Sequence, residues 1–266
     1  MEDELLVRRL GWAGLELAFG DDTLVVDLFE DRHALAPFVE EVTGPLPAPS
    51  TRAACALVTH LHADHADADA IGRALSADGL VLRPEPARGD DLDRAATAAA
   101  EAGLASLAAT VRIVTAWESC SVGPFAVNAV PAVDGFGDPQ VSWVIEAGGR
   151  RVLHGGDTVF HGAWWPIATR FQPFDAVFLP INGAVCDFPH RQPPSPLPAT
   201  LDPLQASVAA AILGAGVAVP IHYDAIHQPR VYEQASHPLR SFLAAASERG
   251  VETRILEPGE WLEWDA

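Results

Sequence analysis

The residues best suited to chemistry stand together in the stretch THLHADH, residues 59–65. It holds three of the ten histidines of the chain, with an aspartate directly before the third. Neutral imidazoles and a carboxylate are good ligands for zinc or iron, and few other roles need them at this density. The spacing predicts a metal site. The alternative is a solvated loop before a helix, with Asp64 or Asp67 as its cap.

The chain around this stretch predicts how the ligands are presented. The apolar run ACALVT, residues 54–59, favours a buried strand that ends where His60 begins. Because residues i and i+2 of a strand point to the same side, His60 and His62 can face one ion. Asp64 and His65 follow where the chain turns toward a helix, and they can face a second ion beside the first.

Periodicity and turn residues divide the rest of the chain into further elements. Helices are predicted at residues 67–76, 92–109, 201–216 and 238–250. Short strands are predicted at residues 5–10, 15–19, 23–29, 54–59, 111–115, 124–130, 141–147, 151–156, 175–181 and 217–223, the first three as successive antiparallel strands. Asp202 as N-cap, with Pro203 in the first turn and Gln205 at the capping-box position, marks one helix start. The layer rules then favour sheets packed face to face with helices outside.

The pattern His60-x-His62-x-Asp64-His65 resembles the signature of the metallo-β-lactamase fold hydrolases. The likeness covers most of the chain, because it extends to the acidic end of LVVDLF at 24–29, to Gly156-Asp157-Thr158 and to His222 in VPIHYD at 219–224. The segments GLELAFGDDTLVVD, FLPINGA and PIHYDAI are similar to the branch that contains the ascorbate-6-phosphate lactonase-like proteins.

This resemblance implies an α/β fold, an αββα four-layer sandwich in a single domain over residues 1–266, with the metal centre at one edge between two sheets. It implies His60 and His62 as ligands of the first metal and Asp64 and His65 as ligands of the second. Asp157 would bridge both ions, and His222 would complete the second site. Asp157 as a cap of the next segment, and His222 as a satisfied core histidine, are the alternatives.

One position departs from the family pattern. The third histidine of the first site normally follows Pro-Ala-x, and here the stretch Val130–Asp134 ends in Asp134 instead. A carboxylate adds negative charge, which makes the ion a poorer Lewis acid and moves the preference toward manganese or ferrous iron. Zn²⁺ is still the expected cofactor, as one or two ions, with Mn²⁺ or Fe²⁺ as alternatives. Asp134 could also be too short to reach, which would leave one metal.

Several further residues have candidate roles, most of them with an alternative. Asp64 is expected to orient the nucleophile, and Tyr223 to donate a hydrogen bond to the developing oxyanion or to be structural. Strand alternation places His154 on the opposite face from Asp157, as a core residue or a support for a ligand. His161 is either a substrate contact or a surface residue.

The loops at 134–139, 161–166 and 186–198 are expected to border the site, because loops at strand ends carry function. Four aromatic residues in them suggest a partly apolar pocket: Phe136, Trp164, Trp165 and Phe188. Arg191 or Arg32 could hold an anionic group. The alternative is that the tryptophans belong to the core and the prolines form a rigid surface lid.

The resemblance implies a hydrolase in which a metal-bound hydroxide attacks a lactone, ester or phosphoester of a small molecule. Two alternatives use the same fold. One is an oxidative or lyase-type enzyme with one iron, and the other is a non-catalytic protein whose first metal site is degraded at Asp134.

Composition excludes several other classes of function. The 36 acidic and 17 basic residues give a net charge of −19, and no basic track is present that would bind nucleic acid. Every basic residue is arginine, which excludes lysine chemistry. The sequence has no apolar run of membrane or signal-peptide length, so we expect a cytoplasmic protein, with homo-oligomerisation left open. The three widely spaced cysteines fit reduced thiols.

Overall fold

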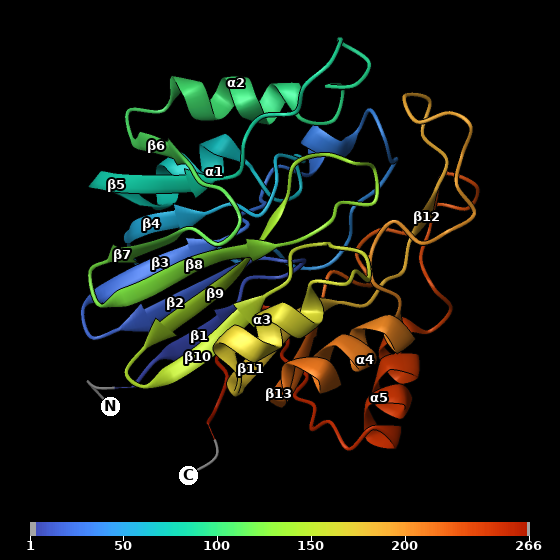
Figure 1. Ribbon diagram of the computed structural model, residues 1–266. Helices are drawn as coiled ribbons and strands as arrows, with labels where there is room; N and C mark the ends of the chain where they lie inside the picture. The colour runs from blue at the N-terminus through green and yellow to red at the C-terminus, as the bar shows by residue number, and fades with distance from the viewer. Residues whose placement is uncertain (1–3, 265–266) are drawn as a thin grey trace.

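The computed structural model describes residues 4–264 and contains two large β-sheets packed face to face with helices on both outer sides (Figure 1). This arrangement confirms the predicted αββα sandwich. In the described part of the chain, no helix is long and apolar enough to span a membrane.

The first sheet has six strands in sequence order. They are β1 (Leu6–Arg9), β2 (Leu15–Phe19), β3 (Asp22–Val26), β4 (Ala53–Leu57), β5 (Leu75–Arg83) and β6 (Thr110–Ile113). The pairs β1·β2 and β2·β3 are antiparallel as predicted, while the pairs from β3 to β6 are parallel. Its outer face is covered by α1 (Ala68–Ala74) and α2 (Ala98–Ser106) (Figure 1).

The second sheet has the strand order β13-β11-β10-β9-β8-β7. The strands are β7 (Ser119–Val122), β8 (Phe125–Pro131), β9 (Val141–Ala147), β10 (Arg150–His154), β11 (Phe174–Pro180) and β13 (Ala215–Ile221). Its outer face is covered by α3 (Trp164–Phe171), α4 (Pro203–Leu213) and α5 (Pro238–Glu248). The short strands β12 (Val185–Cys186) and β14 (Tyr232–Glu233) pair with each other, and the 3₁₀ helix η1 (Arg32–Leu35) follows β3.

Strand β11 illustrates why both faces of a sheet are apolar here. Ala176 and Phe178 point into the core between the sheets, whereas Val177 and Leu179 point into the core beneath the helices. A strand covered on both sides reads as a continuous apolar run rather than an alternating one. The central core thus fixes the distance between the two sheets, and the site lies at their shared edge.

The predicted helix start at Asp202 is confirmed. The Asp202 side chain accepts from the Gln205 backbone N–H, and Gln205 returns a bond to the Asp202 backbone. Two other helix predictions were too long: residues 92–97 form turns before α2, and α1 ends at Ala74 because β5 begins at Leu75. Strands β5 and β7 were not predicted.

Helix α3 corrects the prediction of a loop at residues 161–166. Its N-cap, Ala163, makes no side-chain capping bond, so the sequence carries no start signal there. Pro166 lies in the first turn, where a missing N–H costs nothing, and so it does not interrupt the helix. The amphipathic pattern after Trp164 then buries Ile167, Ala168 and Phe171.

Candidate metal centre

The predicted ligands meet at one edge of the sandwich, where four strands end. His60 and His62 follow β4 of the first sheet, while Asp134 follows β8, Asp157 follows β10 and His222 follows β13 of the second. Loops from both sheets therefore supply the site, as the resemblance implied.

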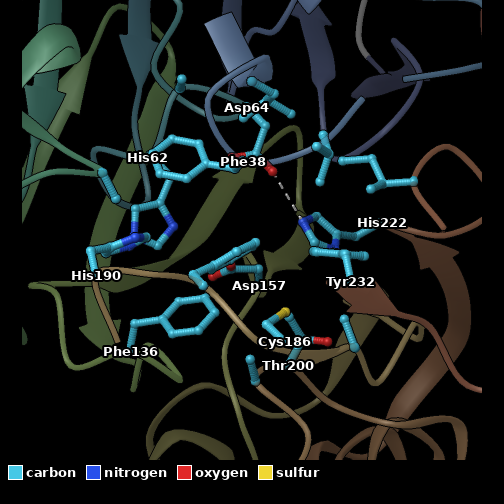
Figure 2. A pocket seen from close by; sticks show the side chains of 18 residues that line it. Phe38, His62, Asp64, Phe136, Asp157, Cys186, His190, Thr200, His222 and Tyr232 are labelled. Atoms are coloured by element: carbon cyan, nitrogen blue, oxygen red, sulfur yellow. Dashed lines mark ion pairs between the residues drawn. The ribbon is translucent and has the colours of Figure 1, made fainter. Parts of the chain in front are cut away.

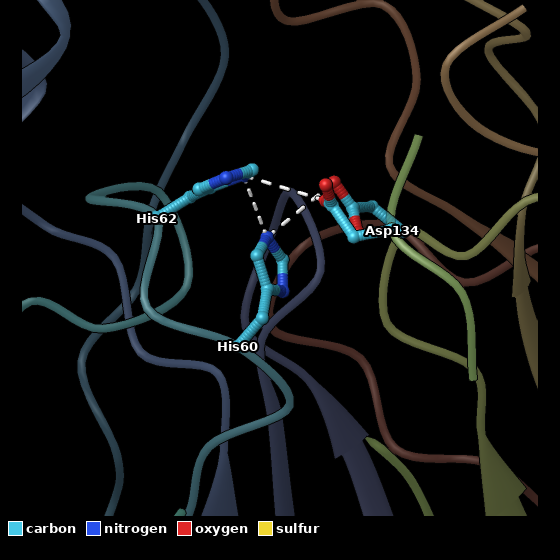
Figure 3. Close-up of side chains that lie close together, drawn as sticks. His60, His62 and Asp134 are labelled. Atoms are coloured by element: carbon cyan, nitrogen blue, oxygen red, sulfur yellow. Dashed lines mark hydrogen bonds and ion pairs between the residues drawn. The ribbon is translucent and has the colours of Figure 1, made fainter. Parts of the chain in front are cut away.

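The first ligand group consists of His60, His62, Asp134 and Asp157, all buried, with one possible ligand atom of each within 4.8 Å of the others. The His60 Nε2 atom lies 2.9 Å from His62 Nδ1 and 3.5 Å from Asp157 Oδ2. The distance from His62 Nδ1 to Asp134 Oδ2 is 3.9 Å. Figure 3 shows His60, His62 and Asp134 pointing toward one another.

Hydrogen bonds at the far sides of the two imidazoles fix which nitrogens face inward. The Thr59 hydroxyl donates to Asp27, so its oxygen accepts from His60 Nδ1 at 3.0 Å. Asp138 accepts from His62 Nε2 at 3.0 Å. These bonds leave lone pairs on His60 Nε2 and His62 Nδ1, which repel each other at 2.9 Å unless a proton or a cation lies between them.

The second ligand group consists of Asp64, His65 and His222. Asp64 Oδ2 lies 3.6 Å from the Nε2 atoms of both His65 and His222 (Figure 2 shows the His222 contact). The His65 Nδ1 atom bonds Asp27 at 2.8 Å, which again leaves Nε2 free to face the site. His222 has a φ of 57°, a conformation that is uncommon outside glycine and that aims its ring at Asp64.

Unpaired buried atoms support a cation at both groups. Among the described residues, the Asp134 Oδ2, His65 Nε2 and His222 Nε2 atoms are buried without a hydrogen-bond partner. Buried polar groups are normally paired because an unpaired one costs about 1–3 kcal/mol. Each of these three atoms belongs to a residue of the two ligand groups, so the donor set fits metal ions better than a solvated loop.

The electrostatics of the centre favour added positive charge. Burial lowers the pKa of the His62 imidazole, but the Asp134 carboxylate and the bond to Asp138 outweigh it and raise that pKa to about 10. Burial and the neighbouring Asp134 carboxylate raise the pKa of Asp157 to about 7, against the opposing effect of His65. Both shifts show that the buried carboxylates of this centre are stabilised by added positive charge.

The sequence left open whether the Asp134 side chain is long enough to reach the first ligand group. Asp134 is 4% exposed, and its Oδ1 atom accepts from the backbone N–H groups of Phe136 and Asp138 at 2.7 and 3.1 Å. Those bonds turn Oδ2 toward His62, so the shorter side chain does reach the first group. Asp157 joins this group as well, and its bridging of both ions stays a prediction.

Gly156 precedes Asp157 for a steric reason. Its φ is 69°, and a Cβ built on it would lie 2.7 Å from the Gln140 side chain and 2.9 Å from the Thr59 hydroxyl. The absence of a side chain lets Gln140 Nε2 donate to Asp157 Oδ1 at 3.0 Å. This bond holds one carboxylate oxygen while the other faces His60.

Of the two roles predicted for Tyr223, the contacts favour the structural one. Tyr223 packs in the core beneath the helices, and its hydroxyl oxygen lies 3.5 Å from the Arg9 guanidinium that donates to it. The neighbouring His222 faces the metal centre, and successive residues at a strand end point to opposite sides. The other tyrosine, Tyr232, lines the cavity instead.

The two predicted anion-binding arginines are engaged elsewhere. Arg32 donates to the carbonyls of Val42 and Gly44, and Arg191 pairs with Asp138 at 3.2 Å. Neither lines the cavity beside the metal groups. Both guanidiniums stabilise loops, because backbone carbonyls and a buried carboxylate occupy their donors.

The aromatic predictions divide in two. Phe136 and Phe188 line the cavity as expected, whereas Trp164 is fully buried beneath α3 and Trp165 is 55% exposed on the far side. Neither tryptophan lines the cavity, because residues 161–166 lead into helix α3; Trp164 belongs to the core, as the alternative predicted.

The remaining histidines lie outside the two ligand groups. His154 is buried, its Nε2 atom donates to the Ala13 carbonyl at 2.7 Å, and its Nδ1 atom lies 3.9 Å from Asp27 Oδ2, which fits its predicted role as a core residue or a support for a ligand. His161 stacks on Trp164 with ring centroids 4.4 Å apart. It is partly exposed there and does not line the cavity, so the predicted surface position fits it better than the substrate contact.

A small cavity opens onto both ligand groups (Figure 2). Its walls are mainly apolar and aromatic, with His62, Asp64, Asp157 and His222 among them. Phe38, His190 and Tyr232 also line it, although no local pattern in the sequence indicates that they approach the site. The thiol of Cys186 faces the same space, but burial and the nearby carboxylates raise its pKa to about 12, so it stays protonated and inert.

Three residues that hydrogen-bond the predicted ligands had no role assigned from the sequence. Trp12 donates its indole N–H to Asp64 Oδ2 at 2.9 Å and packs against the His222 ring at 3.9 Å. Asp27, at the acidic end of LVVDLF, accepts from Thr59 and bonds His65, and Asp138 bonds His62. The family resemblance already included the acidic end of LVVDLF, which is Asp27, and the glycines at positions 11 and 14 indicated a turn around Trp12.

Comparison with known families agrees with this geometry. A family model described as a Beta-lactamase superfamily domain matches residues 23–223. The chain belongs to the beta-lactamase superfamily. This confirms the resemblance at the level of the superfamily, and the narrower lactonase-like branch stays a prediction.

Relatives and solved structures extend the match over nearly the full chain. A protein of Thermus thermophilus described as a UPF0173 metal-dependent hydrolase is 29% identical over 270 residues, which cover 97% of this chain and 99% of that protein. The isothiocyanate hydrolase from Delia radicum gut bacteria shares the fold with a TM-score of 0.66 at 18% identity, over 98% of this chain and 99% of that one. CmlA, a diiron beta-hydroxylase from Streptomyces venezuelae, matches with a TM-score of 0.71 at 17% identity, over 98% of this chain and 54% of that one.

Proposed function

We propose that this chain is a metal-dependent hydrolase of a small, neutral ester or lactone that carries an apolar arm. The proposal rests on one observation: two adjacent ligand groups face a single cavity whose walls are largely apolar. Bound metal ions supply Lewis acidity and lower the pKa of a coordinated water. The hydrolases among the relatives support the enzyme class.

The ligand groups suit two ions, one held by His60, His62, Asp134 and Asp157 and the other by Asp64, His65 and His222. We propose that Asp157 also bridges to the second ion. Imidazole and carboxylate ligands suit zinc, and the carboxylate at position 134 also suits manganese or iron. We take zinc as the first candidate because four of the seven ligands are imidazoles.

Asp64 has the properties of a residue that orients the attacking water. The nearby imidazoles of His65 and His222 outweigh the effect of burial and hold the pKa of its carboxyl well below the usual range. An ionised carboxylate of this kind accepts a hydrogen bond from water but is a weak base. Trp12 fixes Oδ2 by donating to it, so the carboxylate cannot rotate away from the cavity that it lines.

The charge around the cavity favours a neutral substrate. Among the described residues that line it, none is an arginine, while Asp64 and Asp157 both contribute carboxylates. The whole chain carries a net charge of −19, which repels anions at long range. A phosphoester would therefore find no arginine in the inner cavity where the reaction takes place, and a carboxylic ester or lactone is the better match.

The inner cavity is large enough only for the reacting group of a substrate, and the rest of the substrate must lie outside it. The inner cavity measures about 60 Å³, on a scale where one water needs roughly 10–15 Å³. It adjoins a hollow of about 970 Å³, because Phe136, Cys186, His190 and Ala199 line both. A small electrophilic group fits inside, and an apolar arm can extend along Leu92, Phe160 and Leu197 of the hollow, whose wall also includes Arg88 and Arg191. The isothiocyanate hydrolase of the same fold acts, by its name, on a compound class that is also uncharged.

The test is a substrate panel assayed on protein whose metal content is known. Chelator-stripped protein is reloaded with zinc and assayed with an aryl ester, a γ-lactone, an aryl isothiocyanate and an anionic phosphodiester. We expect turnover of a neutral ester or lactone that disappears with chelator and returns with metal. We expect the phosphodiester to react at least about tenfold more slowly, which corresponds to roughly 1.4 kcal/mol in the barrier.

His65→Ala removes a ligand of the second group and should abolish the metal-dependent rate. The matched control is His161→Ala, which changes a histidine outside both groups and should keep that rate. Preference for the phosphodiester, or turnover that survives complete metal removal, would sink the proposal.

An oxidative iron enzyme is the second candidate, and Asp134 is the observation that favours it. A carboxylate in place of a third histidine enriches the first group in hard oxygen ligands, which iron accepts well. The same fold carries a diiron beta-hydroxylase. Iron content of aerobically purified protein, its visible absorption and oxygen uptake with added substrate separate this candidate from the hydrolase.

A further inference from the structure

A chain of contacts leads from the metal centre to the surface through Asp138. Asp138 Oδ2 lies 3.0 Å from His62 Nε2 and 3.2 Å from Arg191 Nη2, so one carboxylate oxygen contacts both side chains. Asp138 is 8% exposed and belongs to neither ligand group. The His62 imidazole and the Arg191 guanidinium together hold its pKa below the usual value despite its burial.

Arg191 joins three segments that are distant in the sequence. Besides Asp138, its guanidinium donates to the carbonyls of Leu92 at 3.4 Å and Asp93 at 3.2 Å. Arg191 itself stands in the proline-rich segment 186–198. The segment therefore has a side-chain link to the loop around Leu92 and to the support of His62.

The same segment builds part of the cavity wall. Phe188 and His190 both line the cavity, and their rings stack with centroids 5.6 Å apart. Phe136 packs against Phe188 at 5.6 Å from the loop that also contains Asp138 (Figure 2 shows Phe136 and His190 at the cavity). A displacement of Arg191 would thus move the wall and release Asp138 together.

We infer that Asp138 and Arg191 are positioning residues that couple metal binding at His62 to the order of segment 186–198. Asp138 accepts from His62 Nε2–H and so keeps the lone pair on Nδ1, the atom that faces the first group. Outer partners of this kind fix the tautomer and the ring orientation of a metal ligand. Energetic coupling is reciprocal, so a metal that holds His62 in place also holds Asp138, Arg191 and the segment. The inference rests on the proposed metal binding.

Trypsin can report the order of the segment without any substrate. The chain contains no lysine, so trypsin cleaves only after arginine, and the Arg191–Gln192 bond lies inside the segment. Cleavage of a folded chain requires local opening, and its rate follows the population of the open form. Added zinc should slow cleavage of chelator-stripped protein at Arg191–Gln192 by about fivefold or more. The Arg249–Gly250 bond after α5 is the internal control and should keep its rate.

Calorimetric titration with zinc provides the second readout. Asp138→Ala should weaken zinc binding by about 10–100-fold and remove the protection of Arg191–Gln192. Asp138→Asn keeps an oxygen that can accept from His62 and should recover part of the affinity. Asp175→Ala removes another Asp–Arg pair, that of Asp175 with Arg150 at 3.0 Å, and should leave both readouts unchanged.

The outcomes distinguish the inference from the proposed function. Wild-type protein that binds no metal in the titration overturns both. Wild-type protein that binds zinc without any change at Arg191–Gln192 overturns the coupling alone. Wild-type affinity in a folded Asp138→Ala variant overturns the positioning role of Asp138.

Discussion

The Asp134 carboxylate offers the sharpest single perturbation of the metal centre. Asp134→Asn keeps an oxygen that can accept from the Phe136 and Asp138 backbone N–H groups, so the loop can retain its conformation. It replaces or neutralises the Oδ2 atom, which is buried without a hydrogen-bond partner among the described residues and lies 3.9 Å from His62 Nδ1. The substitution therefore removes a metal ligand while disturbing the fold little.

The expected loss of zinc affinity follows from the position of the Asp134 Oδ2 atom. Removing a residue that hydrogen-bonds a metal ligand weakens metal binding by about 10–100-fold. Removing the Asp134 carboxylate, which faces the ion itself, should therefore weaken binding by at least about 100-fold. A 100-fold loss equals about 2.7 kcal/mol of metal-dependent stabilisation when the metal is in excess. For a chain of this size, that corresponds to a melting temperature lower by about 5–11 °C in the presence of zinc.

The assay is thermal unfolding of chelator-stripped protein with and without zinc, combined with elemental analysis. Asp134→Asn should lose most of the zinc-induced rise in melting temperature, whereas Asp134→His should keep it. Asp21→Asn, in an exposed turn between β2 and β3, is the control for loss of one negative charge. An Asp134→Asn variant with the full zinc-induced rise would refute the assignment of Asp134 as a ligand.

Three further predictions concern residues whose roles the structure narrowed. Trp164→Ala should lower the free energy of unfolding by about 3–5 kcal/mol, and Trp165→Ala by less than about 0.5 kcal/mol. Urea unfolding in the presence of chelator compares the two variants. Equal losses of stability would contradict the burial of Trp164. Tyr223→Phe should retain kcat/KM within about twofold, because its hydroxyl contacts Arg9 rather than the cavity; a tenfold fall would restore its catalytic assignment. Burial lowers the pKa of His161 to about 4 in the folded state. The neutral His161 imidazole is therefore compatible with full stability above about pH 6.5, and this stability is lost as the pH falls toward 4. The melting temperature of His161→Phe should fall less than that of wild type over this pH range. Identical pH dependence in the two proteins would count against this.

Much of the metal centre could be predicted because its first part is local. His60, His62, Asp64 and His65 stand within six residues, and the period of a strand fixes which of them share a side. The capping box at Asp202 is equally local, since a side chain and backbone groups three residues apart complete it. Such features depend on neighbours in the sequence, so the sequence is enough to find them.

For other residues the sequence left two possible roles, for a different reason. Arg191, Trp164 and Tyr223 have side chains suited to a binding site, but their partners come from segments far away in the chain. Whether a guanidinium is free for a ligand depends on which carbonyls and carboxylates surround it after folding. Residue type alone cannot decide this, because the same side chain serves equally well in structure and in binding.

By itself, the sequence determined the ligand types, their spacing and the strand ends that present them, because these follow from backbone periodicity and local hydrogen bonding. Only the tertiary structure decided that Asp134 reaches His62 and that Asp138 supports the same ring from 76 residues away. It also decided that the cavity offers apolar walls and no arginine among its described lining residues. Those properties arise from the closure of loops from two sheets over one edge, and long-range packing, not local preference, fixes that geometry.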